Sequence, residues 1–171
     1  MEATIKTTTT SAKTDEKPLL AGVITGQIAG LIMAVVVMIV FTVFLGKNPL
    51  YPVQVIGSVL FGEAALQGIH VGALLAGLVL HQLGPSLLWG GIFGLIAAKI
   101  HIQTTQTALV VGLILGIVSM TGPYLLIPAV MNAMQGVDIW NREVPMFWDW
   151  AAHIVFGACF VLYPKIQSKL R

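Results

Sequence analysis

Four long runs of apolar residues limit the folds that this chain can adopt. They cover approximately residues 19–45, 71–98, 107–134 and 145–163. A helix needs about 20 mostly apolar residues to cross the hydrocarbon core of a bilayer. Within that core, a helix also satisfies all of its own backbone hydrogen bonds. The sequence therefore predicts four transmembrane helices.

The composition favours the same environment. Of the 171 residues, 57% are hydrophobic and 9% are charged, whereas a soluble domain carries about a quarter charged residues. Because so few charges cannot cover a water-exposed surface, we expect residues 19–171 to form one transmembrane domain. Residues 1–18 are rich in threonine and lysine, and such a segment predicts a disordered cytoplasmic tail.

The second half of the chain repeats the first at two constant offsets. The matched pairs are Gly22 with Gly112, Gly26 with Gly116, Gly46 with Gly136, Trp89 with Phe156, Gly90 with Gly157, Phe93 with Phe160 and Leu95 with Leu162. We therefore predict an all-α integral membrane protein made of two tandem, parallel helical-hairpin repeats, at about 19–99 and about 107–166. The extra residues of the first repeat, at about 53–70, predict a short interfacial helix between transmembrane helices 1 and 2.

The basic residues predict the orientation, because lysine and arginine are enriched on the cytoplasmic side of a membrane. With four spans, the side that holds both termini carries Lys6, Lys13, Lys17, Lys99, Lys165, Lys169 and Arg171. The other side carries only Lys47 and Arg142. We expect a multi-pass protein of the cytoplasmic (inner) membrane with both termini in the cytoplasm.

Glycines recur four residues apart on three of the predicted helices. They are Gly22, Gly26 and Gly30 on the first, Gly90 and Gly94 on the second, and Gly112 and Gly116 on the third. Small residues at this spacing let the backbones of two membrane helices approach closely. The pattern fits packing within the four-helix bundle, and it also fits contact with another subunit.

A histidine is the main polar residue at mid-membrane depth. The predicted spans carry no acidic or basic residue at their centres, and His153 lies twelve residues from Lys165, about 18 Å along a helix. One interpretation is a neutral imidazole bonded across the bundle to Ser86, Ser119, Thr121 or Asn132. The other is a ligand or proton site in an outward-facing cavity. Prolines that bend helices favour such a cavity, which we predict to comprise His153, Ser86, Pro85, Pro123, Pro128 and Asn132.

No cofactor, metal site or catalytic residue is predicted. His81 and His153 differ in depth by about 9 Å, which disfavours haem ligation by the pair. Met131 and Met134 would suit copper(I), but methionines in apolar helices more often fill space. The net charge of +2 and scattered basic residues exclude a nucleic-acid footprint.

The chain resembles a group of small four-helix bacterial inner-membrane proteins of unknown function, the YagU-like proteins. The resemblance covers about residues 22–164. It rests on the glycine-spaced helices, a proline in each outer loop, the run His81…Trp89-Gly90…Phe93-Gly94, and the run Pro145…His153…Gly157 before a basic end. It implies a four-helix inner-membrane fold and transfers no catalytic residues.

Three functions are compatible with these features. The glycine faces and the lack of central charge favour a non-enzymatic accessory or structural subunit of a membrane assembly, with lipid and other membrane subunits or itself as partners. The alternative is a small oligomeric carrier or channel that uses the His153 cavity for a small solute, a proton or a metal. A membrane enzyme acting on lipid or quinone would have to use acid and base groups at the outer edge, namely Glu63, His70, Asp138, Glu143 and Asp149.

Overall fold

The computed structural model describes residues 17–170, and every regular element in this range is a helix. Residues 1–16, most of the predicted tail, lie outside the described residues. Within the described range, four helical segments are long and apolar enough to cross a membrane, at Pro18–Val43, Val71–Ile100, Thr105–Gln135 and Met146–Ser168. They coincide with the four apolar runs of the sequence, and below we call them the four spans.

Three spans consist of more than one helix. The first span is α1 (Pro18–Val43) alone. The others are α3 (Val71–His81), η2 (Gln82–Trp89) and α4 (Gly90–Ile100); α5 (Thr105–Ser119), η3 (Gly122–Leu126) and α6 (Ile127–Gln135); and α8 (Met146–Ala158), η4 (Cys159–Leu162) and α9 (Tyr163–Ser168). The helices α2 (Tyr51–Phe61), η1 (Gly62–Leu66) and α7 (Ile139–Glu143) connect the spans.

The prolines inside the spans explain two of these interruptions. Pro85 lies in η2 and Pro123 in η3, and both segments are π-helical. A proline lacks the amide proton for the usual i to i−4 bond, and a wide π turn accommodates that loss within a continuous helix. Pro128 lies in the first turn of α6, where its missing N–H is least costly.

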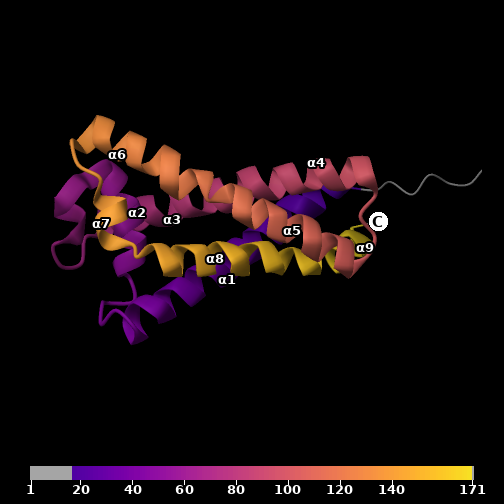
Figure 1. Cartoon of the computed structure of the whole chain (residues 1–171), viewed down its shortest axis with the longest axis horizontal. Helices are drawn as coiled ribbons and strands as arrows, with labels where there is room; N and C mark the ends of the chain where they lie inside the picture. Colours follow the sequence, from indigo (N-terminus) through magenta and orange to yellow (C-terminus); the bar gives the residue numbers. More distant parts are fainter. Residues whose placement is uncertain (1–16, 171) are drawn as a thin grey trace, which may run out of the picture.

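The molecule is an elongated bundle with two distinct ends (Figure 1). We call the end with Lys17, the α4–α5 connection and α9 the terminal end, and the end with α2 and α7 the loop end. Large apolar side chains such as Leu75, Ile114 and Leu125 are exposed along the spans. Such a surface fits the hydrocarbon of a membrane and is unusual for a soluble monomer.

The terminal half of the bundle is tightly packed. Its core contains the buried rings of Phe93, Phe156, Phe160 and Tyr163. Phe93 from α4 stacks on Phe160 from η4 with ring centroids 4.3 Å apart. These contacts between the second and fourth spans leave the centre of the terminal half filled with apolar groups.

Glycines bring the helices of this half into backbone contact. A Cβ added to Gly22 on α1 would lie 2.5 Å from the carbonyl oxygen of Gly90 on α4. A Cβ added to Gly157 on α8 would lie 2.5 Å from the carbonyl oxygen of Gly112 on α5. Gly94 and Gly116 make similar close approaches, and Gly26 and Gly30 are buried on α1. The predicted packing glycines thus face other helices of the same chain.

The loop half is organised differently, because α1 diverges from the bundle there (Figure 1). Helix α2 forms in the segment for which we predicted an interfacial helix. It runs antiparallel to α3: Gly57 lies against the carbonyl group of Ala73, and Gly77 lies against the carbonyl group of Val53. Helix α2 therefore packs along the first part of the second span, and it also contacts α6 and α7.

Candidate functional site

The acidic residues of the described chain are concentrated at one end. Between residues 17 and 170 they are Glu63, Asp138, Glu143 and Asp149, all on elements of the loop half. The terminal end carries Lys17, Lys99, Lys165 and Lys169. Asp149 differs from the other acids because it lies inside a span, on α8, and is only 6% exposed.

Three buried polar side chains form a connected row between α8 and α5. Nδ1 of His153 lies 2.6 Å from Oγ of Ser119, and Nε2 of His153 lies 3.5 Å from Oδ1 of Asp149. Asp149 and His153 are one helical turn apart, so α8 presents both on one face. Ser119 was one of the four partners considered for His153 from the sequence, and the structure provides this bond.

A glycine contact holds α5 and α8 close enough for this bond. A Cβ added to Gly116 on α5 would lie 2.5 Å from the carbonyl oxygen of His153. Any larger residue at position 116 would push α8 away, and the 2.6 Å contact between Ser119 and His153 would lengthen. The glycine spacing of the sequence thus serves the polar row as well as general packing.

The hydrogen-bond geometry assigns the protons in this row. Oγ of Ser119 also lies 2.7 Å from the carbonyl oxygen of Gly116, and a carbonyl only accepts. The amide of Met120, the usual helical partner of that carbonyl, donates to Ile117 instead. The Ser119 hydroxyl therefore donates to Gly116, and it accepts from Nδ1–H of His153.

This assignment leaves Nε2 of His153 facing the carboxyl group of Asp149. Both groups are acceptors when His153 is neutral and Asp149 is ionised. A proton bound to either group, as a carboxylic acid or as an imidazolium, makes the contact favourable. The row can therefore take up and release one proton between Asp149 and His153 while Ser119 keeps the imidazole oriented.

An apolar cavity of about 140 Å³ adjoins this row. It lies between the diverging part of α1, the first turns of α2, the end of α3 and the first half of α8, and it is partly open. Asp149 and His81 line it, and so do the aromatic side chains Phe41, Trp140 and Trp148. Asp149 thus connects the cavity to His153 and Ser119.

This cavity does not have the residues that the sequence analysis grouped. Among the predicted residues with described side chains, His153, Pro123, Pro128 and Asn132 do not line it. Pro123 and Pro128 are buried in η3 and α6, and Asn132 is exposed. The side chains of Pro85 and Ser86 lie outside the description, although both residues belong to η2. The cavity instead lies where α1 diverges from α8, whereas α6 packs on α2 and α7.

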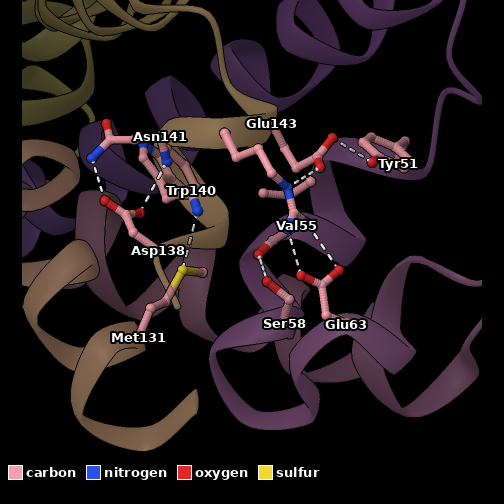
Figure 2. A network of polar contacts seen from close by, with 10 residues as sticks. Tyr51, Val55, Ser58, Glu63, Met131, Asp138, Trp140, Asn141 and Glu143 are labelled. Carbon is pink, nitrogen blue, oxygen red and sulfur yellow. Dashed lines mark hydrogen bonds and ion pairs between the residues drawn. The ribbon is translucent and has the colours of Figure 1, made fainter. Parts of the chain in front are cut away.

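The methionines considered for copper do not converge. Met131 is buried, and its sulfur accepts the amide proton of Trp140 at 3.3 Å (Figure 2). Met134 is 54% exposed on the same helix. Among the described residues, no group of three or more histidine, cysteine, aspartate and glutamate side chains is placed to hold a metal ion.

From the sequence, Asp149 was placed at the outer edge, and neither Asp149 nor His81 was included in the predicted cavity. The i, i+4 spacing of Asp149 and His153 was a usable signal, since it puts both side chains on one helix face. His81 could not be found in this way because its place depends on how α3 packs. In the structure it lines the same cavity as Asp149.

A second polar cluster joins the connecting segments at the loop end (Figure 2). Arg142 on α7 binds both carboxylate oxygens of Glu63 on η1, at 2.5 and 2.9 Å. Its Nε donates to Glu143 at 2.7 Å, and the Tyr51 hydroxyl of α2 donates to the same carboxylate at 2.7 Å. The cluster ties α7 to α2 and η1, which precede the second span.

The charges of this cluster reinforce one another. The hydrogen bonds and charge of Arg142 hold the pKa of Glu63 below its usual value. Burial raises the pKa of Glu143, but hydrogen bonds from Tyr51 and Arg142 lower it more. Burial, together with the hydrogen bond to Glu143, raises the pKa of Tyr51 to about 12. Both carboxylates are therefore ionised and Tyr51 is protonated at neutral pH.

Comparison of the chain with models of protein families, with curated proteins and with solved structures finds no match. The resemblance to the YagU-like proteins therefore stays a prediction from its motifs. The function has to be argued from the site itself.

Proposed function

We propose that this protein is a small, non-enzymatic carrier of the cytoplasmic membrane that binds and releases protons at Asp149 and His153. One observation carries the proposal: the buried row Asp149–His153–Ser119 lies inside the spans, and Asp149 reaches a cavity. Ionisable residues within a membrane are costly, so they usually mark a path for protons, ions or substrates.

The packing favours a carrier over a continuous channel. On the loop side, the cavity gives access to Asp149. On the terminal side, the rings of Phe93, Phe156, Phe160 and Tyr163 and the glycine contacts fill the described bundle. Release towards the terminal end therefore requires a rearrangement of the helices, as alternating access does.

Charge distribution supports the proposed orientation, with both termini in the cytoplasm. Within the described range, the terminal end carries four lysines, whereas the loop end carries two basic residues, Lys47 and Arg142. Arg142 is also neutralised by Glu63 and Glu143. In this orientation the cavity faces the outer leaflet, and α2 dips into that leaflet beside α3.

The two-repeat architecture is also part of the proposal. The residue pairs Gly22–Gly90 and Gly112–Gly157 make the same backbone contact in the first and second hairpins. They occupy matched positions of the sequence repeat. Two parallel hairpins related in this way would place Gln82 of the first repeat at the position of Asp149 in the second. The polar row is then a specialisation of the second repeat.

The carrier proposal is tested with the full-length protein in liposomes. A potassium gradient with valinomycin imposes a membrane potential, and a pH-sensitive dye inside the liposomes reports proton entry. We expect entry to exceed that of protein-free liposomes, and we expect Asp149→Asn and His153→Gln to abolish the difference. Thr42→Val is the matched control, since the Thr42 hydroxyl is exposed and, among the described contacts, bonds the carbonyl group of Met38 on its own helix.

Two results would overturn the carrier. One is proton entry by the unchanged protein that equals entry into protein-free liposomes. The other is undiminished entry with both Asp149→Asn and His153→Gln. Size-exclusion chromatography of each variant in detergent shows whether a loss of activity reflects loss of fold.

An accessory subunit remains the second candidate, and one observation favours it. In an 18-residue apolar window of the Val71–Ile100 span, 12% is buried inside the bundle, whereas the corresponding share in the other three spans is 28% to 39%. This span therefore leaves the largest face for another membrane protein. The glycine faces no longer support this candidate, because their close contacts are made within the chain. Purification in mild detergent with a stoichiometric partner would favour the subunit.

A further inference from the structure

The cavity beside Asp149 has a lining that recognises one class of molecule. Its walls are almost entirely apolar, and three aromatic side chains, Phe41, Trp140 and Trp148, contribute to them. Neither lysine nor arginine occurs among its described lining residues. Asp149 is the one acidic residue among the described residues of this lining.

A buried carboxylate beside aromatic rings is suited to an organic cation. Asp149 is 6% exposed, and it lines the cavity together with Trp140 and Trp148. An ionised carboxylate at this depth is costly without a counter-charge, and a bound cation supplies one. The faces of tryptophan and phenylalanine rings also attract cations through their quadrupoles. An anion would meet neither a lysine nor an arginine among the described lining residues.

The size and position of the cavity limit the shape of this cation. A dry apolar cavity of about 150 Å³ holds a molecule the size of benzene, and this cavity has about 140 Å³. One face of α1 forms a wall of the cavity. The opposite face of α1, which includes Val35, Ile39 and Val43, is exposed along the span. A single ring therefore fits inside, while an attached apolar tail would extend past α1 into lipid.

We propose that the cavity binds a lipophilic cation with a flat aromatic head, in which the ring lies among Phe41, Trp140 and Trp148 and the charge faces Asp149. This inference rests on the proposed function in one respect, since the cation and the transported proton would compete for Asp149. It names the class of molecule that would compete with protons at such a carrier.

The test measures binding to the purified full-length protein in detergent with N-octylpyridinium. Pyridinium rings quench tryptophan fluorescence, and Trp140 and Trp148 line the cavity. We expect saturable quenching by N-octylpyridinium that octylbenzene, its uncharged match, does not displace at equal concentration. Equal affinity of the two compounds, measured by competition, would overturn the proposal because it would remove the role of the charge.

Variants locate the site. Asp149→Asn is expected to weaken N-octylpyridinium binding by about tenfold or more, as expected when one partner of a buried charge pair is neutralised. Val36→Phe is expected to weaken it because Val36 lines the cavity, whereas Val35→Phe places the same ring on the exposed face of the same helix. Equal effects of Val36→Phe and Val35→Phe, or unchanged binding in all three variants, would contradict the cavity.

The outcomes also separate this inference from the carrier itself. Binding without proton entry into liposomes would reject the carrier and keep the cation site. Proton entry without saturable quenching would keep the carrier and reject the cation site. The liposome assay contains no pyridinium, so neither result depends on the other.

Discussion

Oγ of Ser119 and Nδ1 of His153 lie 2.6 Å apart where α5 and α8 meet, with both side chains buried. Because the Ser119 hydroxyl donates to the carbonyl group of Gly116, this contact fixes the imidazole tautomer. It therefore directs the unprotonated nitrogen of His153 towards Asp149. In the proposed carrier, this single hydroxyl would determine which nitrogen of the histidine exchanges protons.

Replacing Ser119 by alanine should weaken the bundle and free the imidazole. We expect the free energy of unfolding to fall by about 1 kcal/mol, because hydrogen bonds between membrane helices contribute about that much. The measurement is reversible unfolding in mixed micelles. Ser58→Ala is the control, since buried Ser58 makes the same i−3 bond to a backbone carbonyl and bonds no other side chain in the described contacts. Equal losses in the two variants would show that the bond to His153 contributes nothing.

Alanine at Gly112 should separate α5 from α8. Its Cβ would overlap the carbonyl group of Gly157 and would lie 2.6 Å from Cβ of Phe160. Overpacking of this kind costs about 1–3 kcal/mol, which the same unfolding measurement detects. Gly91→Ala is the matched control, because a Cβ at Gly91 meets nothing within 4 Å. A stable Gly112→Ala protein would contradict the backbone contact.

Acid should loosen the loop-end cluster. Arg142 holds the pKa of Glu63 below its usual 4.5, and the hydrogen bonds of Glu143 lower that pKa as well. A carboxyl group with a lowered pKa in the folded state stabilises the fold above its unfolded pKa, and this stabilisation is lost as pH falls through the lowered value. The difference in melting temperature between the unchanged protein and Arg142→Gln should therefore be constant near pH 7 and shrink below pH 4.5. A difference that grows with acid would contradict the cluster.

The orientation can be tested by cysteine labelling. In a Cys159→Ala background, a cysteine at position 47 should react with a membrane-impermeant maleimide on intact cells. A cysteine at position 99 should react only after lysis, because Lys99 lies at the terminal end and Lys47 at the loop end. The reverse pattern would place both termini outside and would overturn the argument from positive charges.

The sequence was sufficient to predict the spans and the helix-packing glycines, because both follow from local rules. A run of about 20 apolar residues, and small residues that recur four positions apart, can both be recognised without knowing which helix packs against them. The proline positions likewise marked η2 and η3, where Pro85 and Pro123 lie. These features belong to single helices, so the sequence alone carries them.

The cavity could not be predicted because it depends on how separate elements pack. Helix α2 packs antiparallel along α3, and α1 diverges from α8, so space opens beside Asp149 and His81. Asn132 is exposed because the adjacent residue, Met131, occupies the buried face of α6. A residue list drawn from helix depth alone cannot distinguish two faces of one helix.

Two close glycine contacts join the spans in pairs: Gly22 with Gly90 joins the first and second spans, and Gly112 with Gly157 joins the third and fourth. The first and second spans can therefore pair during synthesis, before the ribosome has made the third and fourth. Biogenesis can then proceed in two steps, and the Arg142–Glu63 fork joins the two pairs of spans. Two separately expressed halves, divided between α4 and α5, would find each other in the bilayer by the same route.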